Sequence, residues 1–283
     1  MAAKPEIAIV GPGRLGSALA VELRRAGYSI REIISRTNRG SQQRAQELAD
    51  LVGARATTAK KARLDADLIW LCVPDGEIAA AARELAQSTQ WKKKLAFHSS
   101  GALGSDELQD LRKRGALPAS VHPMMTFVRG AIPSLQGVPF ALEGHVAAVR
   151  VARRIVHDLG GKAFSISRKN KVAYHAWGGF LSPLLVALLI AGEQVARAAG
   201  VSAADARKNM QPIVRQTLAN YAKLGPAGAF TGPIGRGDTA TVRQHLRVLK
   251  KVPDAREVYA ALARVALRRL PVRNRKELER LLR

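Results

Sequence analysis

Three glycines near the start of the chain have the spacing of a nucleotide-binding turn. The apolar run 7–10 leads into Gly11-Pro12-Gly13-Arg14-Leu15-Gly16, and a helical pattern of leucines follows. In such a turn the first glycine lets the chain leave a buried strand, the second lets a pyrophosphate approach the backbone, and the third lets the helix pack on the strand. Phosphate oxygens then accept hydrogen bonds from N–H groups at the helix N-terminus. The residues expected to bind a dinucleotide here are Gly11, Gly13, Arg14, Leu15 and Gly16; the alternative is a glycine turn with no ligand.

The end of the second expected strand, residues 29–35, indicates which dinucleotide would bind. Ser35 and Arg36 stand there, about 20 residues past the glycines, where NAD-binding folds place a carboxylate on the ribose 2′-hydroxyl. An arginine instead accommodates a 2′-phosphate. Ser35, Arg36, Thr37 and Arg39 therefore favour NADP, although Arg36 could also be one more surface arginine of a basic chain.

Small and polar residues follow three further expected strands. The strand 67–73 ends at Val73-Pro74-Asp75, the strand 95–98 ends at Ser99-Ser100-Gly101, and the strand 119–121 leads into His122. Ligands of open α/β sheets bind outside the carboxyl ends of the strands. The residues expected to line the cofactor are Val73, Pro74, Asp75, Ser99, Ser100 and Gly101. His98, inside its strand, is interpreted as structural.

The alternation of strands and helices predicts an α/β fold with a doubly wound parallel sheet over residues 1–167. Strands are expected at 54–58, 139–143 and 163–166, with a helix at 146–159. Long helical patterns then cover 171–199, 202–224, 239–248, 254–270 and a short stretch from 274, which predicts an all-helical domain over 168–283. The glycine-rich stretch 225–238 between them is expected to be irregular.

Composition limits the class of protein. The first apolar run is too short for a secretory signal, and a single cysteine, Cys72, permits no internal disulfide, so a cytoplasmic location is expected. Residues 176–192 carry no charge, but they include two glycines and a proline, so a buried helix is favoured over a membrane span.

The formal net charge is +24, from 46 Lys+Arg against 22 Asp+Glu. Such a field attracts phosphates, nucleic acid or acidic substrates. The basic residues are nevertheless scattered, which favours a solvated surface over specific nucleic-acid recognition. Because the sequence shows neither metal-ligand spacing, nor paired carboxylates, nor a Ser-His-Asp order, we expect neither a metal site nor hydrolytic chemistry.

Several motifs together resemble one family. The motifs are Gly-Pro-Gly-Arg-Leu-Gly (11–16), Cys-Val-Pro-Asp (72–75), His-Ser-Ser-Gly (98–101), Val-His-Pro-Met (121–124), the helix 171–188 and Thr-Gly-Pro-Ile-Gly-Arg-Gly-Asp (231–238). The chain resembles NADP-dependent oxidoreductases in which a Rossmann-like domain precedes a helical domain of unknown function called DUF2520. That family is similar in architecture to 6-phosphogluconate and β-hydroxyacid dehydrogenases, pyrroline-5-carboxylate reductase and deazaflavin-dependent NADP reductases. The resemblance implies a dimerising helical domain and an active site between the domains.

The resemblance also suggests acid–base residues. In the β-hydroxyacid branch a lysine and an asparagine four residues later polarise the substrate oxygen; here Lys171 is followed by His175, so the helical spacing is kept and the second partner differs. Lys171, His175 and His122 are therefore the catalytic candidates. The alternatives are a solvated helix-start cation for Lys171 and a structural histidine bonded to a loop carbonyl for His122.

Three residues of the helical domain are substrate candidates. Family members often carry asparagine at or near the position of Ser182. Arg236 could bind a substrate carboxylate and Asp238 could order its loop, unless the two form an internal salt bridge.

The sequence thus predicts a cytoplasmic NADP-dependent oxidoreductase that acts on a small carbonyl, imine or hydroxy-acid substrate and forms a homodimer through its helical domain, without membrane contact. The alternative is a catalytically inactive dinucleotide-binding sensor or scaffold, with its basic surface contacting nucleic acid. A deazaflavin as the redox partner of NADP is a third possibility, suggested only by the distant relatives.

Overall fold

The structure, a computed structural model, describes residues 3–87 and 91–283. It divides into two compact units, Met1–Gly179 and Phe180–Arg283, each of which is described by itself. The domain boundary expected at residue 167 therefore falls inside the first unit, which continues into the helix that begins at Lys171.

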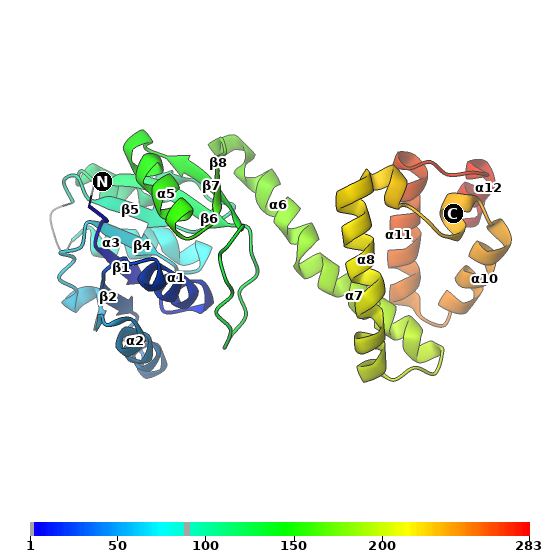
Figure 1. Cartoon of the computed structure of the whole chain (residues 1–283), viewed down its shortest axis with the longest axis horizontal. Coiled ribbons are helices and arrows are strands. Elements are labelled where there is room, and N and C mark those ends of the chain that lie inside the picture. The colour runs from blue at the N-terminus through cyan, green and yellow to red at the C-terminus, as the bar shows by residue number, and fades with distance from the viewer. Residues whose placement is uncertain (1–2, 88–90) are drawn as a thin grey trace. The chain divides into compact units, whose positions relative to one another are not determined.

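The first unit is built on a single sheet (Figure 1). Among the described residues its strands are β1 (Ile7–Val10), β2 (Ile30–Ser35), β3 (Arg55–Thr58), β4 (Leu68–Leu71), β5 (Leu95–His98), β6 (Leu117–Pro123), β7 (Pro139–Gly144) and β8 (Lys162–Ser165). Their order across the sheet is β3-β2-β1-β4-β5-β6-β7-β8. The strand numbers rise from β1 to β3 on one side of the sheet and from β4 to β8 on the other, so the order changes direction between β1 and β4. Open α/β sheets bind ligands at such a point.

One pairing differs from the expected parallel sheet. Strands β6 and β7 are antiparallel, with Val121 opposite Leu142, whereas every other pairing between the described strands is parallel. A parallel neighbour requires a crossover, usually a helix, but the chain between Pro123 and Pro139 contains no helix or strand. The strand–helix alternation therefore predicts the doubly wound fold correctly and fails at this one connection.

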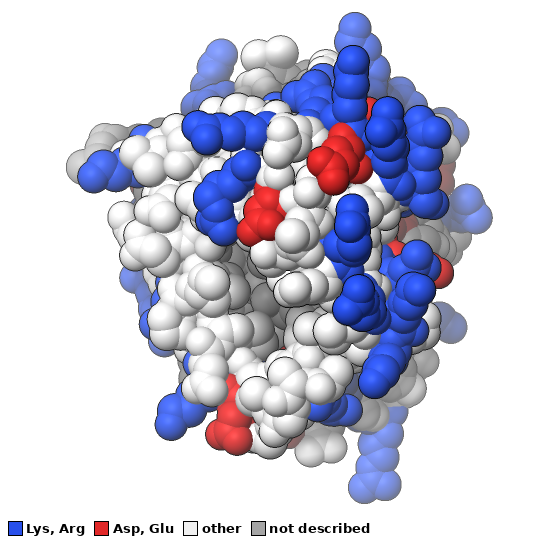
Figure 2. Space-filling model, turned by 90° about the vertical axis from the view of Figure 1, so that its right-hand side faces the viewer, with Lys and Arg blue, Asp and Glu red and all other residues white. Residues whose placement is uncertain are grey.

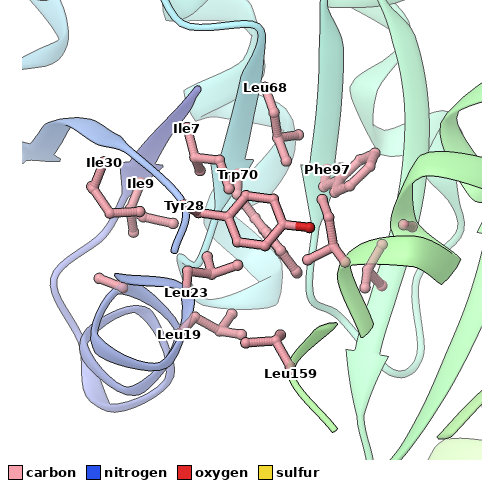
Figure 3. Packing of buried hydrophobic residues seen from close by; sticks show 14 of the residues in the cluster. Ile7, Ile9, Leu19, Leu23, Tyr28, Ile30, Leu68, Trp70, Phe97 and Leu159 are labelled. Carbon is pink, nitrogen blue, oxygen red and sulfur yellow. The ribbon is translucent and has the colours of Figure 1, made fainter. Parts of the chain in front are cut away.

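Helices cover both faces of the sheet. The helices of the first unit are α1 (Arg14–Arg25), α2 (Arg39–Val52), α3 (Ile78–Leu85), α4 (Gln109–Lys113), α5 (Val146–Asp158) and α6 (Lys171–Leu181), the last of which ends just inside the second unit. In β1 alternate side chains point to opposite faces, so Ile7 and Ile9 join one buried cluster while Ala8 and Val10 join another. The first cluster includes Tyr28, and Trp70 packs edge-to-face on Phe97 with ring centroids 5.4 Å apart (Figure 3).

The second unit is helical in the part of the chain described. Its helices are α7 (Pro183–Ala198), α8 (Ala203–Ala229), α9 (Pro233–Arg236), α10 (Thr239–Leu249), α11 (Pro253–Arg269) and α12 (Arg275–Leu281). The expected continuous helix 171–199 is broken at Ser182, because Pro183 lacks the N–H that a helix interior needs. The expectation that 225–238 is irregular throughout is also wrong. Only Gly225 leaves helical geometry within α8, and α9 forms a short helix with Pro233 at its start.

The charge-free stretch 176–192 is not buried in this chain, contrary to expectation. Trp177, Phe180, Leu184 and Ile190 are each more than half exposed. By length and composition the segment Arg168–Ala198 could cross a membrane, and only 6% of its most apolar window is buried. A stretch without charged residues indicates an apolar surface that is unfavourable to expose to water. It does not indicate which part of the protein, or which partner, covers that surface.

The excess of positive charge lies on the surface. On the face shown in Figure 2, Lys and Arg side chains surround an uncharged, hollowed centre, and Asp and Glu side chains are few. In the second unit the basic residues of α10, α11 and α12 have few acidic partners, since Arg243 with Glu277, at 3.8 Å, is the one ion pair found among the described residues of these three helices.

Gly16 and Gly13, in the turn between β1 and α1, give a matched test of packing. A Cβ on Gly16 would lie 2.1 Å from the carbonyl oxygen of Gly11, whereas a Cβ on Gly13 would meet no described heavy atom within 4 Å. We expect Gly16→Ala to lower the free energy of unfolding by about 2 kcal/mol or more, because overpacking forces the backbone to move. Gly13→Ala should lower it by less, about 1 kcal/mol or below, because only the preference of the N-cap for glycine over alanine is lost. Urea unfolding followed by circular dichroism measures both, and equal losses would contradict the close approach of helix and strand.

Candidate functional site

The turn between β1 and α1 brings the backbone of three segments together. Gly11 has a φ of +98° and its Cα lies so close to the end of β4 that a Cβ would be 2.7 Å from the carbonyl oxygen of Cys72. The N–H of Gly11 donates to the carbonyl oxygen of Ile34 at 2.8 Å. The turn is therefore fixed between the carboxyl ends of β2 and β4.

The N-terminus of α1 is open to a ligand. Gly13 is its N-cap, no side chain among the described residues caps it, and its first turn contains no acidic residue. The first N–H groups of a helix have no partner within the helix, and the helix dipole favours an anion there. Arg14 is exposed beside this end, whereas Leu15 packs toward the core. An anionic group on this backbone would be held without any charged side chain.

A cavity of about 610 Å³ lies beside this turn. Its lining includes six of the residues expected to contact a cofactor: Gly11, Gly13, Ser35, Arg36, Val73 and Pro74. The other seven, which are not among the lining residues, are Arg14, Leu15, Gly16, Asp75, Ser99, Ser100 and Gly101. Cys72 also lines it, and burial raises the pKa of its thiol to about 12, which makes it an inert wall residue.

The end of the cavity near β2 is cationic. Arg36, Arg44 and Lys60 line it, together with the carboxylates of Glu77 and Glu84. The Arg36 guanidinium lies 3.1 Å from Glu77, and Arg44 donates to the hydroxyl of Ser41 at 3.2 Å. Sequence reasoning found Arg36 but missed Arg44 and Lys60. The signal for Lys60 is the pairing of β2 with β3, which puts Ser35 opposite Thr58 and brings the turn after Thr58 to the same edge.

The serines after β5 are used to hold the turn. Ser99 Oγ accepts a hydrogen bond from the Trp70 indole at 2.8 Å. Ser100 Oγ donates to Asp75 at 2.8 Å and accepts from the N–H groups of Ala102 and Leu103. Asp75, expected at the cofactor, thus fixes the β4 end to the β5 end.

His98 has a structural environment. It is fully buried, and its Nδ1 accepts from the N–H of Ser100 at 3.1 Å, so its Nε2 carries the proton that it donates to the Gly104 carbonyl at 2.8 Å. Burial lowers the pKa of His98 to about 4. The ring is therefore neutral at physiological pH and unavailable for acid–base chemistry.

Lys171 is fully buried at the start of α6. Its Nζ donates to the Ser120 hydroxyl at 2.7 Å and to the Ser100 carbonyl at 3.1 Å. The interpretation of Lys171 as a solvated cation is therefore wrong. Burial lowers its pKa, and the nearby carboxylates of Glu143 and Asp75 oppose that shift.

His122 lies beside Lys171 and is hydrogen-bonded to a residue that the sequence did not suggest. Its Nδ1 is 2.8 Å from the hydroxyl of Tyr174, not from a loop carbonyl. Burial lowers the pKa of His122 to about 4, and the charges of Lys171, His175 and His98 act in the same direction. Burial also raises the pKa of Tyr174 to about 12. Both groups are neutral at physiological pH.

His175 and Gly101 complete this group. The His122 and His175 rings are 6.0 Å apart between centroids. Both rings pack where a side chain on Gly101 would be, since a Cβ there would lie 2.8 Å from His122 Nε2 and 2.7 Å from His175 Cδ2. Helical spacing could have revealed Tyr174, because it lies three residues after Lys171 and shares its face. We call Lys171, Ser120, His122, Tyr174 and His175 the β6 group.

The three substrate candidates of the helical part lie in the second unit. Ser182 precedes α7, and Arg236 ends α9. Asp238 caps α10, accepting from the Thr241 N–H at 3.0 Å and from its hydroxyl at 2.7 Å. In the described parts of the chain no group of three His, Cys, Asp or Glu residues is placed to hold a metal ion.

Comparison with family models gives both halves of the chain a description. Residues 1–123 match the Rossmann-like domain, and residues 138–266 match DUF2520, a domain of unknown function. The chain is a Rossmann-like domain followed by a DUF2520 domain. The family resemblance read from the motifs is therefore confirmed.

Solved structures share the fold of the Rossmann-like and DUF2520 chain. A candidate NADP oxidoreductase from Bacteroides fragilis has 22% identity and a TM-score of 0.77 over 93% of this chain and 97% of its own. A protein from Thermotoga maritima has 25% identity and a TM-score of 0.71 over 92% and 96%. An imine reductase from Myxococcus stipitatus in complex with NADP+ has 18% identity and a TM-score of 0.67 over 99% and 100%. A comparison with curated proteins found no match.

The buried His98 should make the fold sensitive to acid. Its pKa is lowered from 6.5 to about 4, so its contribution to stability is complete above pH 6.5 and is lost as the pH falls toward 4. Between pH 7 and pH 4.5 we expect this one residue to account for about 2.5 kcal/mol of lost stability.

Urea unfolding at both pH values, compared between the wild type and His98→Gln, measures this contribution. The variant should be less stable at pH 7 but should lose less stability on acidification. The same pH dependence in both proteins would show that His98 does not titrate in this way.

Proposed function

We propose that this protein is an NADP-dependent oxidoreductase that acts on a small carbonyl, imine or hydroxy-acid substrate. The observation that carries the proposal is the cavity that joins the open N-terminus of α1 to Arg36, Arg44 and Lys60. One end suits a pyrophosphate held by backbone, and the other suits a second phosphate held by side chains. NADP differs from NAD by such a second, 2′-phosphate.

The residues present fit this cofactor. Gly11 and Gly13 leave the backbone accessible to a pyrophosphate, because neither carries a side chain at the helix N-terminus. Arg36 and Arg44 offer the planar donor groups that suit phosphate oxygens, and Lys60 adds a point charge. The imine reductase of the same fold is in complex with NADP+, which agrees with this assignment.

The β6 group handles protons in this proposal. Its residues Ser120 and His122 are in the last part of β6, whose carboxyl end lies at the same sheet edge as the turn after β1, because β1, β4, β5 and β6 are parallel. Neighbouring strands are about 4.8 Å apart and β6 is the third strand from β1, so these residues lie about 14 Å along the edge from that turn. A bound nicotinamide cofactor supplies the hydride. His122 and His175 are the residues proposed to orient the substrate and move its proton, and the buried Lys171 is the proposed catalytic cation that acts on them from below the surface.

A homodimer in the cytoplasm is the assembly that we propose, with the helical domain forming the contact. Exposed apolar side chains lie along α7 and α8, among them Val186, Ile190, Ile213 and Leu218. Monomeric soluble proteins rarely expose contiguous apolar patches of this kind, and a second copy would cover them. Ser182, Arg236 and Asp238 stay proposed substrate contacts of the same domain.

The cationic end of the cavity predicts coenzyme preference. We expect Arg36→Ala and Arg44→Ala each to weaken NADPH binding about tenfold or more, because each removes a charge-assisted hydrogen bond to the 2′-phosphate, while NADH binding should change little. Fluorescence titration of both coenzymes measures the effect. Arg24→Ala on α1 is a matched control, since Arg24 is exposed and does not line the cavity. Equal losses for NADPH and NADH would contradict a 2′-phosphate site, and no NADPH binding by the wild type would refute the proposed function.

The exposed face of α7 predicts the assembly. We expect Ile190→Asp to convert a dimer into a monomer in sedimentation velocity, because it places a charge within an apolar contact. Leu51→Asp on α2 is the control, since Leu51 is also more than half exposed but belongs to the first unit, apart from α7 and α8 in sequence. A monomeric wild type, or recovery of the wild type in the membrane fraction of cells, would contradict the proposed dimer.

A further inference from the structure

The β6 group contains a cation that cannot itself reach a substrate. Lys171 is fully buried, and two of its Nζ donors are used by Ser120 and by the Ser100 carbonyl. A residue in this position acts through its neighbours and through its electric field. Two members of the group have exposed surface that a ligand could contact: His122 is half-buried and His175 is exposed.

His122 is hydrogen-bonded to a second proton donor, the hydroxyl of Tyr174. Tyr174 is 7% exposed, and its hydroxyl lies 2.8 Å from His122 Nδ1. When that hydroxyl donates to Nδ1, the imidazole carries its own proton on Nε2. His122 is half-buried, and its Nε2 lies beside Gly101 at the end of β5, where the absence of a side chain leaves room for the ring, because a Cβ on Gly101 would be 2.8 Å from this nitrogen.

The two carboxylates near the β6 group accept hydrogen bonds from serines. Asp75 accepts from Ser100 Oγ, and Glu143 accepts from both the N–H and the hydroxyl of Ser105. The other titratable groups around His122 are His98 on β5 and Lys171, Tyr174 and His175 on α6. These hydrogen bonds leave both carboxylates charged, and their charge acts on Lys171. The charges that lower the pKa of His122 are those of Lys171, His175 and His98, so the field at His122 is positive.

We infer that the substrate class is a carbonyl compound rather than an iminium ion, and that the hydrogen-bonded pair His122 and Tyr174 supplies the proton, with Lys171 as a positioning residue. This inference rests on the proposed oxidoreductase function. Reduction of a carbonyl builds negative charge on oxygen, which a buried cation and fixed N–H donors stabilise. An iminium ion brings positive charge, which the same cation repels in a medium of low dielectric constant.

In the proposed reduction, a carbonyl compound is converted to an alcohol. A hydride adds to the carbonyl carbon, and the electron pair of the C=O π bond moves to the oxygen. That oxygen takes the proton of His122 Nε2 while the Tyr174 hydroxyl passes its proton to Nδ1. A solvent proton then restores the Tyr174 hydroxyl. The product is an alcohol, and one hydride and one proton have been consumed.

The first test compares substrate classes and variants. The probes are a panel of aliphatic aldehydes, ketones and 2-oxo acids, and a panel of cyclic imines, each with NADPH. We expect the wild type to reduce members of the carbonyl panel at least tenfold faster than any imine. Tyr174→Phe and His122→Phe should lower kcat about a hundredfold with NADPH affinity unchanged, as is typical when an acid–base group is lost. Tyr259→Phe is the matched control, because Tyr259 also contacts a histidine, His245 at 3.3 Å, in the second unit.

A second measurement needs no turnover. Nitrogen-15 NMR of histidine-labelled protein should show His122 as the neutral Nε2–H form from pH 8 down to about pH 5, since its pKa is about 4. Lys171→Met should raise that pKa, because it removes a positive charge, whereas Lys171→Arg should keep it low. A role for Lys171 in packing alone would leave the pKa the same in both variants.

The outcomes separate the two levels of the proposal. Loss of NADPH binding in the wild type refutes the proposed function, whatever the NMR spectra show. NADPH binding with faster reduction of imines, with unchanged turnover in Tyr174→Phe, or with His122 protonated at pH 7 overturns the inference and leaves the function intact. NADPH binding with turnover of neither panel counts against both.

Discussion

The burial of the Lys171 ammonium is the interaction on which the arrangement of the candidate site depends. A buried charge is tolerated only when its donors are satisfied, and here the partners come from the ends of two neighbouring strands, Ser100 after β5 and Ser120 in β6. Meeting that requirement fixes the first turn of α6 against the sheet edge. Tyr174 and His175, one turn later, are thereby placed beside His122 and Gly101.

The two ends of the proposed site use positive charge in different ways. At the cavity, Arg36, Arg44 and Lys60 line a space next to solvent that a soluble anion can enter. At the β6 group, Lys171 is isolated from water and acts over a distance on neutral donors. The high net charge of the chain is consistent with both, but neither arrangement follows from it, because the basic residues elsewhere are spread over the surface.

Much of the fold could be predicted from the sequence, because strand and helix periodicities and the glycine turn are local signals. The antiparallel β7 could not, since its direction is decided by a connection without a helix. For the site, Lys171 and His122 were identified by motif, but their burial and the bond to Tyr174 depend on which faces of α6 and β6 meet. Arg44 and Lys60 were missed for the same reason: they join Arg36 through strand pairing and helix packing, and not through proximity in sequence.

The ion pair between Arg36 and Glu77 gives the cavity an internal competitor for anions. A phosphate that binds to Arg36 exchanges with a carboxylate tethered to the opposite wall, instead of displacing only dissolved counterions. Such an exchange releases fewer salt ions than binding to a bare arginine would, so affinity at this end should fall less steeply with ionic strength. Because the pair is exposed and such pairs are weak, a phosphate that carries two charges can displace the Glu77 carboxylate from Arg36, whereas a singly charged anion such as chloride gains less from the exchange.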